Sequence, residues 1–215
     1  MKNVAVILAG CGVYDGAELH ESVLTLLALA KGGAKVQCFA PDIEQAHVVN
    51  HLTGEEQEQS RNVLVESARV ARGEVRPLSE LHADDFDALV VPGGFGAAKN
   101  LSDFAFNGTD SVVESSVLAA TQSFAKLNKP AAYLCIAPAM LPNIYGKGIK
   151  LTIGNDPDTA AAIVAMGGEH INCCVDQFVY DPKHNVLSTP AYMLAENIAQ
   201  AADGIDKTIE KLLSL

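Results

Sequence analysis

Short apolar runs alternate with helical patterns along the whole chain, and this alternation limits the fold more than any other feature of the sequence. Strands are predicted at 4–9, 35–40 and 130–134, and within 88–94, where a buried strand ends at Val91 and runs into a glycine turn. Helices are predicted at 17–33, 60–73, 109–127, after Pro138, at 157–167 and at 193–213. Strands that alternate with helices form a mostly parallel sheet covered on both faces. The sequence therefore predicts an α/β sandwich of three layers.

Three segments give weaker signals. The stretches "DQFVYD" and "NVLST" on either side of Pro182 predict a β-hairpin, and residues 42–54 fit either a hairpin or a loop near Gly54.

The predicted helix at 17–33 has apolar side chains along one face: Leu19, Val23, Leu26, Leu27 and Ala30. No Gly/Ser-rich linker or internal repeat divides the chain, and 215 residues suit one large core, so residues 1–215 are predicted to be a single domain.

Composition excludes several classes of function. The formal net charge of −11 argues against nucleic-acid binding, which needs clustered Lys and Arg. Five cysteines are an odd number in a chain of this size, which favours reduced thiols and a cytoplasmic location over a disulfide framework. No Cys or His spacing is typical of a metal site. The apolar run at 4–9 is too short for a signal peptide, and we expect no membrane segment.

Unusual residues follow three of the predicted strands. Glu18, His20 and Glu21 begin the helix after the first strand, "PGGFG" at 92–96 follows the third, and Cys135 follows the fourth. Because parallel sheets place their sites at the carboxyl ends of strands, we expect these residues to lie together. The joint at Cys135 resembles a nucleophile elbow, although the literal G-x-S-x-G pattern is absent.

The position of Cys135 suggests a chemical role. A thiol at a helix N-terminus lies near free N–H groups and the positive end of the helix dipole, which lowers its pKa, so Cys135 is expected to be the most reactive thiol. The same N–H groups, with those of the Gly93-Gly94 turn, can hold an oxyanion. Taken singly, each feature also has a structural explanation: a buried inert cysteine, a simple turn, and acidic residues that suit the helix dipole.

In combination these stretches resemble the class I glutamine-amidotransferase-like superfamily, in the branch of the parkinsonism-associated deglycase and the PfpI-type proteins. The resemblance is greatest to the ElbB-type glyoxalases, which include proteins labelled isoprenoid biosynthesis protein with amidotransferase-like domain. It covers nearly the whole chain in these stretches: "VILAGCGVYDGAELHE", "HLTGE", "VVPGGFGAAKNLS", "CIAPAMLP", "LTIG" and "STPAYMLAENIA". It implies a flavodoxin-like sandwich with a nucleophile elbow, and a homodimer.

The resemblance also implies roles for individual residues. The nucleophile falls on Cys135 and its acidic partner on Glu21. The oxyanion donors fall on the backbone N–H groups of Gly94 and Ile136, beside Gly93. Glu18 falls on a second pocket carboxylate of the relatives.

Histidine is where this chain departs from its relatives. Ile136 occupies the place of the His that follows the cysteine in proteases and amidotransferases, and Gly154 that of the pocket His of deglycases. Glutaminase and protease activity are therefore disfavoured. His20 is next to Glu21 in the sequence and so points away from it around the helix, and Asn100 and Tyr192 are further candidates for the lining of the pocket. Surface or loop positions are expected for the other histidines: His47, His51, His82, His170 and His184.

The predicted function is that of a cofactor-independent glyoxalase, a lyase that acts without glutathione, with a possible apparent deglycase activity. Cys135 would form a hemithioacetal with glyoxal, and Glu21 would move the proton that turns it into a thioester of glycolate. The expected partner is a small dicarbonyl substrate, with no metal or other cofactor. Two alternatives remain open: a redox sensor in which Cys135 is oxidised, and an interaction protein in an isoprenoid-related pathway.

Overall fold

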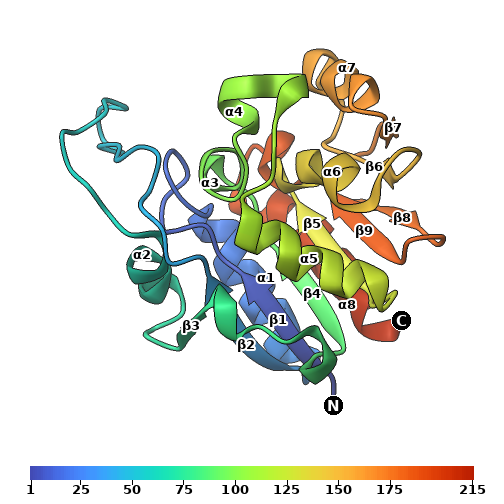
Figure 1. The fold of residues 1–215 in the computed structure, drawn as a ribbon. Coiled ribbons are helices and arrows are strands. Elements are labelled where there is room, and N and C mark those ends of the chain that lie inside the picture. The colour runs from blue at the N-terminus through green and yellow to red at the C-terminus, as the bar shows by residue number, and fades with distance from the viewer.

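A computed structural model describes all 215 residues and contains a seven-stranded, mostly parallel sheet (Figure 1). The strand order is β3-β2-β1-β4-β5-β9-β8, and only the edge pair β8–β9 is antiparallel. The strands are β1 Asn3–Ile7, β2 Lys35–Ala40, β3 Val75–Pro77, β4 Ala88–Val91, β5 Ala131–Leu134, β8 Val179–Asp181 and β9 Val186–Thr189. A separate pair of short parallel strands is formed by β6 Lys150–Leu151 and β7 Glu169–His170.

Helices cover both faces of the sheet, so the fold is the predicted flavodoxin-like sandwich. Helix α8 packs beside α1 on one face, and α5 covers the other (Figure 1). The helices are α1 Leu19–Lys31, α2 Val63–Val70, α3 Phe95–Lys99, α4 Phe104–Asn107, α5 Ser115–Lys126, α6 Leu141–Tyr145, α7 Pro157–Ala165 and α8 Ile198–Ser214. None of them is both long and apolar enough to cross a bilayer.

Capping residues explain where two helices depart from the prediction. Helix α5 begins six residues later than the predicted start at 109, because Glu114 caps it by accepting hydrogen bonds from the N–H groups of Ser116 and Val117. Helix α8 begins at Ile198 rather than 193, since Asn197 caps it in the same way. The predicted helix after Pro138 is a short 3₁₀ turn, Ala137–Met140, that continues into α6.

The apolar face predicted for α1 is not the face that packs on the sheet. Leu19, Val23 and Leu27 are between 43% and 49% exposed. The buried side chains of this helix are Glu21, Ser22, Thr25, Ala28 and Leu29. Polar groups therefore occupy the inner face of α1, where Glu21 points into the protein at the carboxyl end of the sheet.

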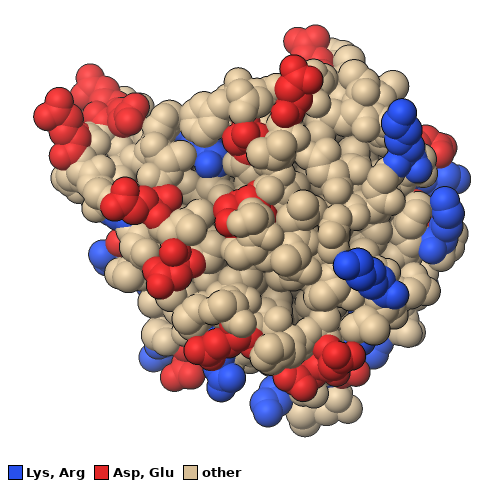
Figure 2. Space-filling view, viewed as in Figure 1, with Lys and Arg blue, Asp and Glu red and all other residues tan.

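A loop at residues 42–62 projects from the body of the protein (Figure 1). It is partly a hairpin, with isolated antiparallel bridges between Val49 and Glu56 and between Glu44 and Asn62. Its tip carries acidic side chains that stand out at one edge of the molecule (Figure 2). Of the two structures predicted for residues 42–54, the hairpin is therefore closer to the observed one, and its turn lies at residues 51–53.

Candidate active site

Cys135 occupies a strained turn between β5 and the 3₁₀ turn Ala137–Met140. Its φ of 59° lies in the left-handed region, which is unfavourable for residues other than glycine. Such a conformation costs on the order of 1–2 kcal/mol and persists only where the surroundings enforce it. The Cys135 N–H donates to the carbonyl of Thr189 at 3.0 Å, which ties the turn to β9. The chain thus has the strand–turn geometry of a nucleophile elbow, with Cys135 at its corner.

Glu21 is completely buried and is held at both carboxyl oxygens. Its Oε2 accepts a hydrogen bond from the Gly93 N–H at 2.9 Å, and its Oε1 accepts one from the Tyr192 N–H at 3.1 Å. Burial raises the pKa of Glu21 from 4.5 to about 7, although these two hydrogen bonds and the contact with Cys135 act in the opposite direction. A carboxyl with this pKa both accepts and donates protons near neutral pH.

Glu18 caps α1 and also contacts the turn that contains Gly93. Its Oε2 accepts a hydrogen bond from the Glu21 N–H at 2.6 Å, and its own N–H donates to the Gly93 carbonyl at 2.9 Å. Only 8% of the residue is exposed, toward the cavity described below. Glu18 therefore fixes the start of α1 and the position from which Glu21 extends.

Gly93 lies where these groups converge, and it has no room for a side chain. An added Cβ would overlap Cβ of Cys135, would lie 2.8 Å from the Leu134 carbonyl oxygen, and would lie 2.9 Å from Oε2 of Glu21. Gly94, with φ of 91°, turns the chain into α3. The backbone N–H groups of Gly94 and Ile136 both act to lower the pKa of the Cys135 thiol, so both lie close enough to influence charge at the sulfur.

The expected low pKa of Cys135 is wrong. Burial, and then the negative charge of Glu21, hold the pKa of the thiol well above its ordinary value, and the N–H groups of Gly94 and Ile136 offset this only in part. The physical reason is that the sulfur is buried and lies beside the Glu21 carboxyl, and the position of Cys135 between a strand and a helix reveals neither fact. In the resting protein Cys135 is thus a thiol beside a titrating carboxyl.

A cavity of about 300 Å³ opens onto Cys135. Glu18, Gly94, Cys135 and Ile136 were predicted to be at the site and do line it, whereas Glu21 lies behind them. The other lining residues are Val13, Phe95, Thr159, Tyr192 and Met193. Sequence reasoning missed Thr159 because it comes from α7, and no local pattern reveals that this helix borders the same cavity as Cys135. Phe95 belongs to the quoted "PGGFG" stretch and could have been found there.

Of the other residues considered for the pocket, Tyr192 lines the cavity and Asn100 does not. Tyr192 lines the cavity, and its hydroxyl lies 2.7 Å from Nδ1 of His20, so His20 reaches the site through Tyr192. Asn100 does not line the cavity, contrary to expectation. Its buried side chain donates to the carbonyls of Ala9 and Asp15 and so fixes the loop after β1. An added Cβ at Gly154 would come within 2.9 Å of Leu194, so a side chain of histidine size would displace Leu194.

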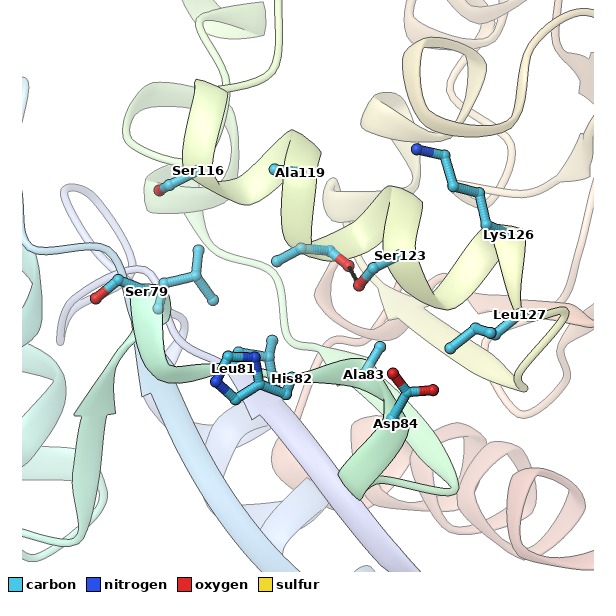
Figure 3. A pocket seen from close by; sticks show the side chains of 12 residues that line it. Ser79, Leu81, His82, Ala83, Asp84, Ser116, Ala119, Ser123, Lys126 and Leu127 are labelled. Atoms are coloured by element: carbon cyan, nitrogen blue, oxygen red, sulfur yellow. Dashed lines mark hydrogen bonds between the residues drawn. The ribbon is translucent and has the colours of Figure 1, made fainter.

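A larger hollow of about 540 Å³ lies elsewhere, between residues 78–84 and helix α5 (Figure 3). It is lined by a mixture of small, apolar and polar side chains, with His82, Asp84 and Lys126 among them. None of the predicted site residues borders it. No three His, Cys, Asp or Glu side chains in the protein come together in a way that could hold a metal ion.

Comparison with known proteins places this arrangement in a family. The model of the DJ-1/PfpI family matches residues 3–176. The chain belongs to the DJ-1/PfpI family. Among curated relatives, an ES1 protein homolog, mitochondrial, from Rattus norvegicus is 43% identical, and the match covers 99% of this chain and 83% of the relative. The human glutamine amidotransferase-like class 1 domain-containing protein 3, mitochondrial, is also 43% identical, with 99% and 82% covered.

Solved structures of the DJ-1/PfpI family and related proteins support the fold. An isoprenoid biosynthesis protein with amidotransferase-like domain from Ehrlichia chaffeensis has a TM-score of 0.93 and 36% identity, with 100% of this chain and 99% of that chain covered. Drosophila melanogaster DJ-1beta has a TM-score of 0.58 and 20% identity, with 100% and 91% covered, and shows a likeness of fold alone.

Proposed function

We propose that the protein is a cofactor-independent glyoxalase, which converts glyoxal and water into glycolate. The observation that carries this proposal is the Glu21 carboxyl, buried beside the Cys135 thiol and held by the N–H groups of Gly93 and Tyr192. Such a pair can add a thiol to an aldehyde and then move a proton between neighbouring carbons. These are the two operations that the conversion of a dicarbonyl into a hydroxy acid requires.

The first step is addition. The Cys135 sulfur bonds to one aldehyde carbon of glyoxal, the thiol proton passes to the Glu21 carboxylate, and the carbonyl oxygen takes the resulting negative charge. The N–H groups of Gly94 and Ile136 stabilise that oxyanion. Return of the proton to the oxygen gives a neutral hemithioacetal, so a thiol with a raised pKa need not ionise before the substrate arrives.

The second step is an isomerisation. The Glu21 carboxylate removes the proton from the hemithioacetal carbon, and the neighbouring carbonyl oxygen takes a proton from water, which gives an enediol. Glu21 then returns its proton to the second carbon, and the first hydroxyl releases its proton to water, so that a thioester forms and the protons balance. Water cleaves the thioester to glycolate and the free thiol. The reaction balances as glyoxal plus water to glycolic acid, with no change in overall oxidation state.

The test is product analysis by NMR after incubation with glyoxal or methylglyoxal, with Cys135→Ala as the control. We expect glycolate from glyoxal and lactate from methylglyoxal, and neither product from the variant. In D₂O the proton held by Glu21 exchanges with solvent, so the new C–H position should contain deuterium. Product formation that persists in Cys135→Ala would contradict the proposal.

The two alternatives give different results. A redox sensor or an interaction protein would show no product above the Cys135→Ala background, and a sensor would change partner binding after peroxide treatment. The Ehrlichia chaffeensis relative is named for isoprenoid biosynthesis, and that name belongs to that protein. A cytoplasmic location, a homodimeric state and an apparent deglycase activity remain predictions for this chain.

A further inference from the structure

The cavity above Cys135 is much larger than glyoxal. Its volume of about 300 Å³ is at the lower end of the range for small-molecule pockets, which runs from roughly 300 to 1,000 Å³. Glyoxal has only two carbons and two oxygens. With its reacting carbon at the sulfur and its oxygen against the N–H groups of Gly94 and Ile136, most of the cavity would stay empty or wet.

The part of the cavity beyond the thiol is bordered by apolar side chains. Val13, Phe95, Ile136 and Met193 all line it, and all four are partly exposed rather than packed into the core. Phe95 is 48% exposed, and its N–H donates to the Val13 carbonyl at 2.8 Å, which keeps these two walls together. Partly exposed apolar walls gain free energy when an apolar group of a ligand covers them.

No positive charge lines the cavity. Its only ionisable lining groups are Glu18, Cys135 and Tyr192, and Glu21 lies behind them. The ammonium group of Lys99 lies 5.2 Å from the centre of the Phe95 ring, but Lys99 does not line the cavity, and this group donates to the Tyr14 carbonyl at 3.0 Å and lies 3.3 Å from Nδ1 of His47. A substrate carboxylate would therefore meet the acidic groups of the cavity without a partner.

We infer that the site acts on an uncharged 2-oxoaldehyde that carries an apolar substituent larger than methyl. This inference rests on the proposed function. Phenylglyoxal is a suitable probe: Cys135 would add to its aldehyde carbon, Glu21 would move the proton from that carbon to the former ketone carbon, and water would release mandelate. Its ring would lie against Phe95 and Met193.

The first test compares kcat/KM for methylglyoxal, phenylglyoxal and 4-carboxyphenylglyoxal, each corrected by the Cys135→Ala background. We expect phenylglyoxal to exceed methylglyoxal by about tenfold or more, the size of effect that a few apolar contacts produce. The kcat/KM for the carboxylated analogue should be no higher than that for methylglyoxal. Equal values for all three, or a preference for the anionic analogue, would overturn the inference.

A pair of variants locates the effect. Phe95→Ala should lower kcat/KM for phenylglyoxal by a larger factor than it lowers kcat/KM for methylglyoxal, and so remove most of the preference between the two substrates. Phe106→Ala is the matched control, since Phe106 is 51% exposed, close to the 48% of Phe95, and does not line the cavity. A loss of preference that is equal in both variants would contradict the role of the cavity wall.

A second measurement does not depend on turnover. Alkylation of Cys135 by iodoacetamide can be followed by peptide mapping in the presence of acetophenone, which is neutral, or benzoate, which is anionic and similar in shape. We expect acetophenone to slow the alkylation and benzoate to have little effect. If no dicarbonyl is turned over but acetophenone still protects, the proposed function fails and the apolar cavity stands. If dicarbonyls are turned over and acetophenone does not protect, the inference fails alone.

Discussion

The backbone N–H of Tyr192 lies 3.1 Å from Oε1 of Glu21 and joins the segment after β9 to the inner face of α1. The Gly93 N–H makes the second hydrogen bond to the same carboxyl, from the segment after β4. Three distant parts of the chain thereby fix one side chain next to Cys135. A carboxyl that served only to cap its own helix would not need donors from two other strand ends.

Replacement of Glu21 by Gln tests its role in proton transfer. The amide has nearly the same size but cannot accept and return a proton, and general acid–base catalysis is typically worth about 10²–10⁴-fold. We expect glyoxal turnover by Glu21→Gln to fall by that factor while Cys135 can still be alkylated. Glu18→Gln is the comparison, because its amide oxygen can keep the hydrogen bond with the Glu21 N–H. Near-normal turnover in Glu21→Gln would remove Glu21 from the mechanism.

The same variant should change how stability depends on pH. Burial raises the pKa of Glu21 from 4.5 to about 7, so folding favours its protonated form. The stabilisation is complete below about pH 4.5 and is lost as pH rises through 7, and it amounts to on the order of 3 kcal/mol. Between pH 5 and 8 the free energy of unfolding of the wild type should therefore decrease. The decrease should exceed that of Glu21→Gln by this amount. Urea unfolding at several pH values measures both, and parallel curves would contradict the prediction.

Local sequence signals predicted the strand ends well. Apolar runs placed Cys135 directly after β5 and the Pro92-Gly93 turn directly after β4, and the topology of parallel sheets brings such ends together. The start of α8 was less predictable, because the apolar pattern continues upstream of the cap at Asn197. The inner face of α1 was predicted incorrectly, since the polar residues Ser22 and Thr25 are buried there while Leu19 and Leu27 remain exposed.

The electrostatic environment of Cys135 could not be predicted from its neighbours in the sequence. The position of the thiol at a predicted helix N-terminus suggested a low pKa, but the pKa depends on how deeply the sulfur is buried and on the charge of Glu21, which is distant in sequence. The link between His20 and Tyr192 is likewise long-range. Such properties arise from packing between distant segments.

Cys174, rather than Cys135, should therefore react first with iodoacetamide at pH 7. Cys174 is exposed, whereas Cys135 is buried and burial raises its pKa. Cys38 should also react slowly, since it is buried within a strand and its pKa is raised to about 11. Peptide mapping after limiting alkylation gives the order. If Cys135 were labelled before Cys174, the pocket would have to open far more widely than the structure shows.

The last prediction concerns the contact between Gly93 and Cys135. Gly93→Ala would place a methyl group against Cβ of Cys135, the Leu134 carbonyl and Oε2 of Glu21, and none of these can move without disturbing the elbow. Overpacking of this kind typically costs about 1–3 kcal/mol, and here it would also displace the Glu21 carboxyl, so under the proposed mechanism turnover should be lost. Gly54→Ala is the control: with φ of 76° and no atom within 4 Å of the added Cβ, it carries backbone strain without crowding. It should cost about 1 kcal/mol and keep its activity. Urea unfolding and glyoxal turnover of both variants separate the two effects, and a Gly93→Ala protein with full turnover would show that the close approach is not needed for the chemistry.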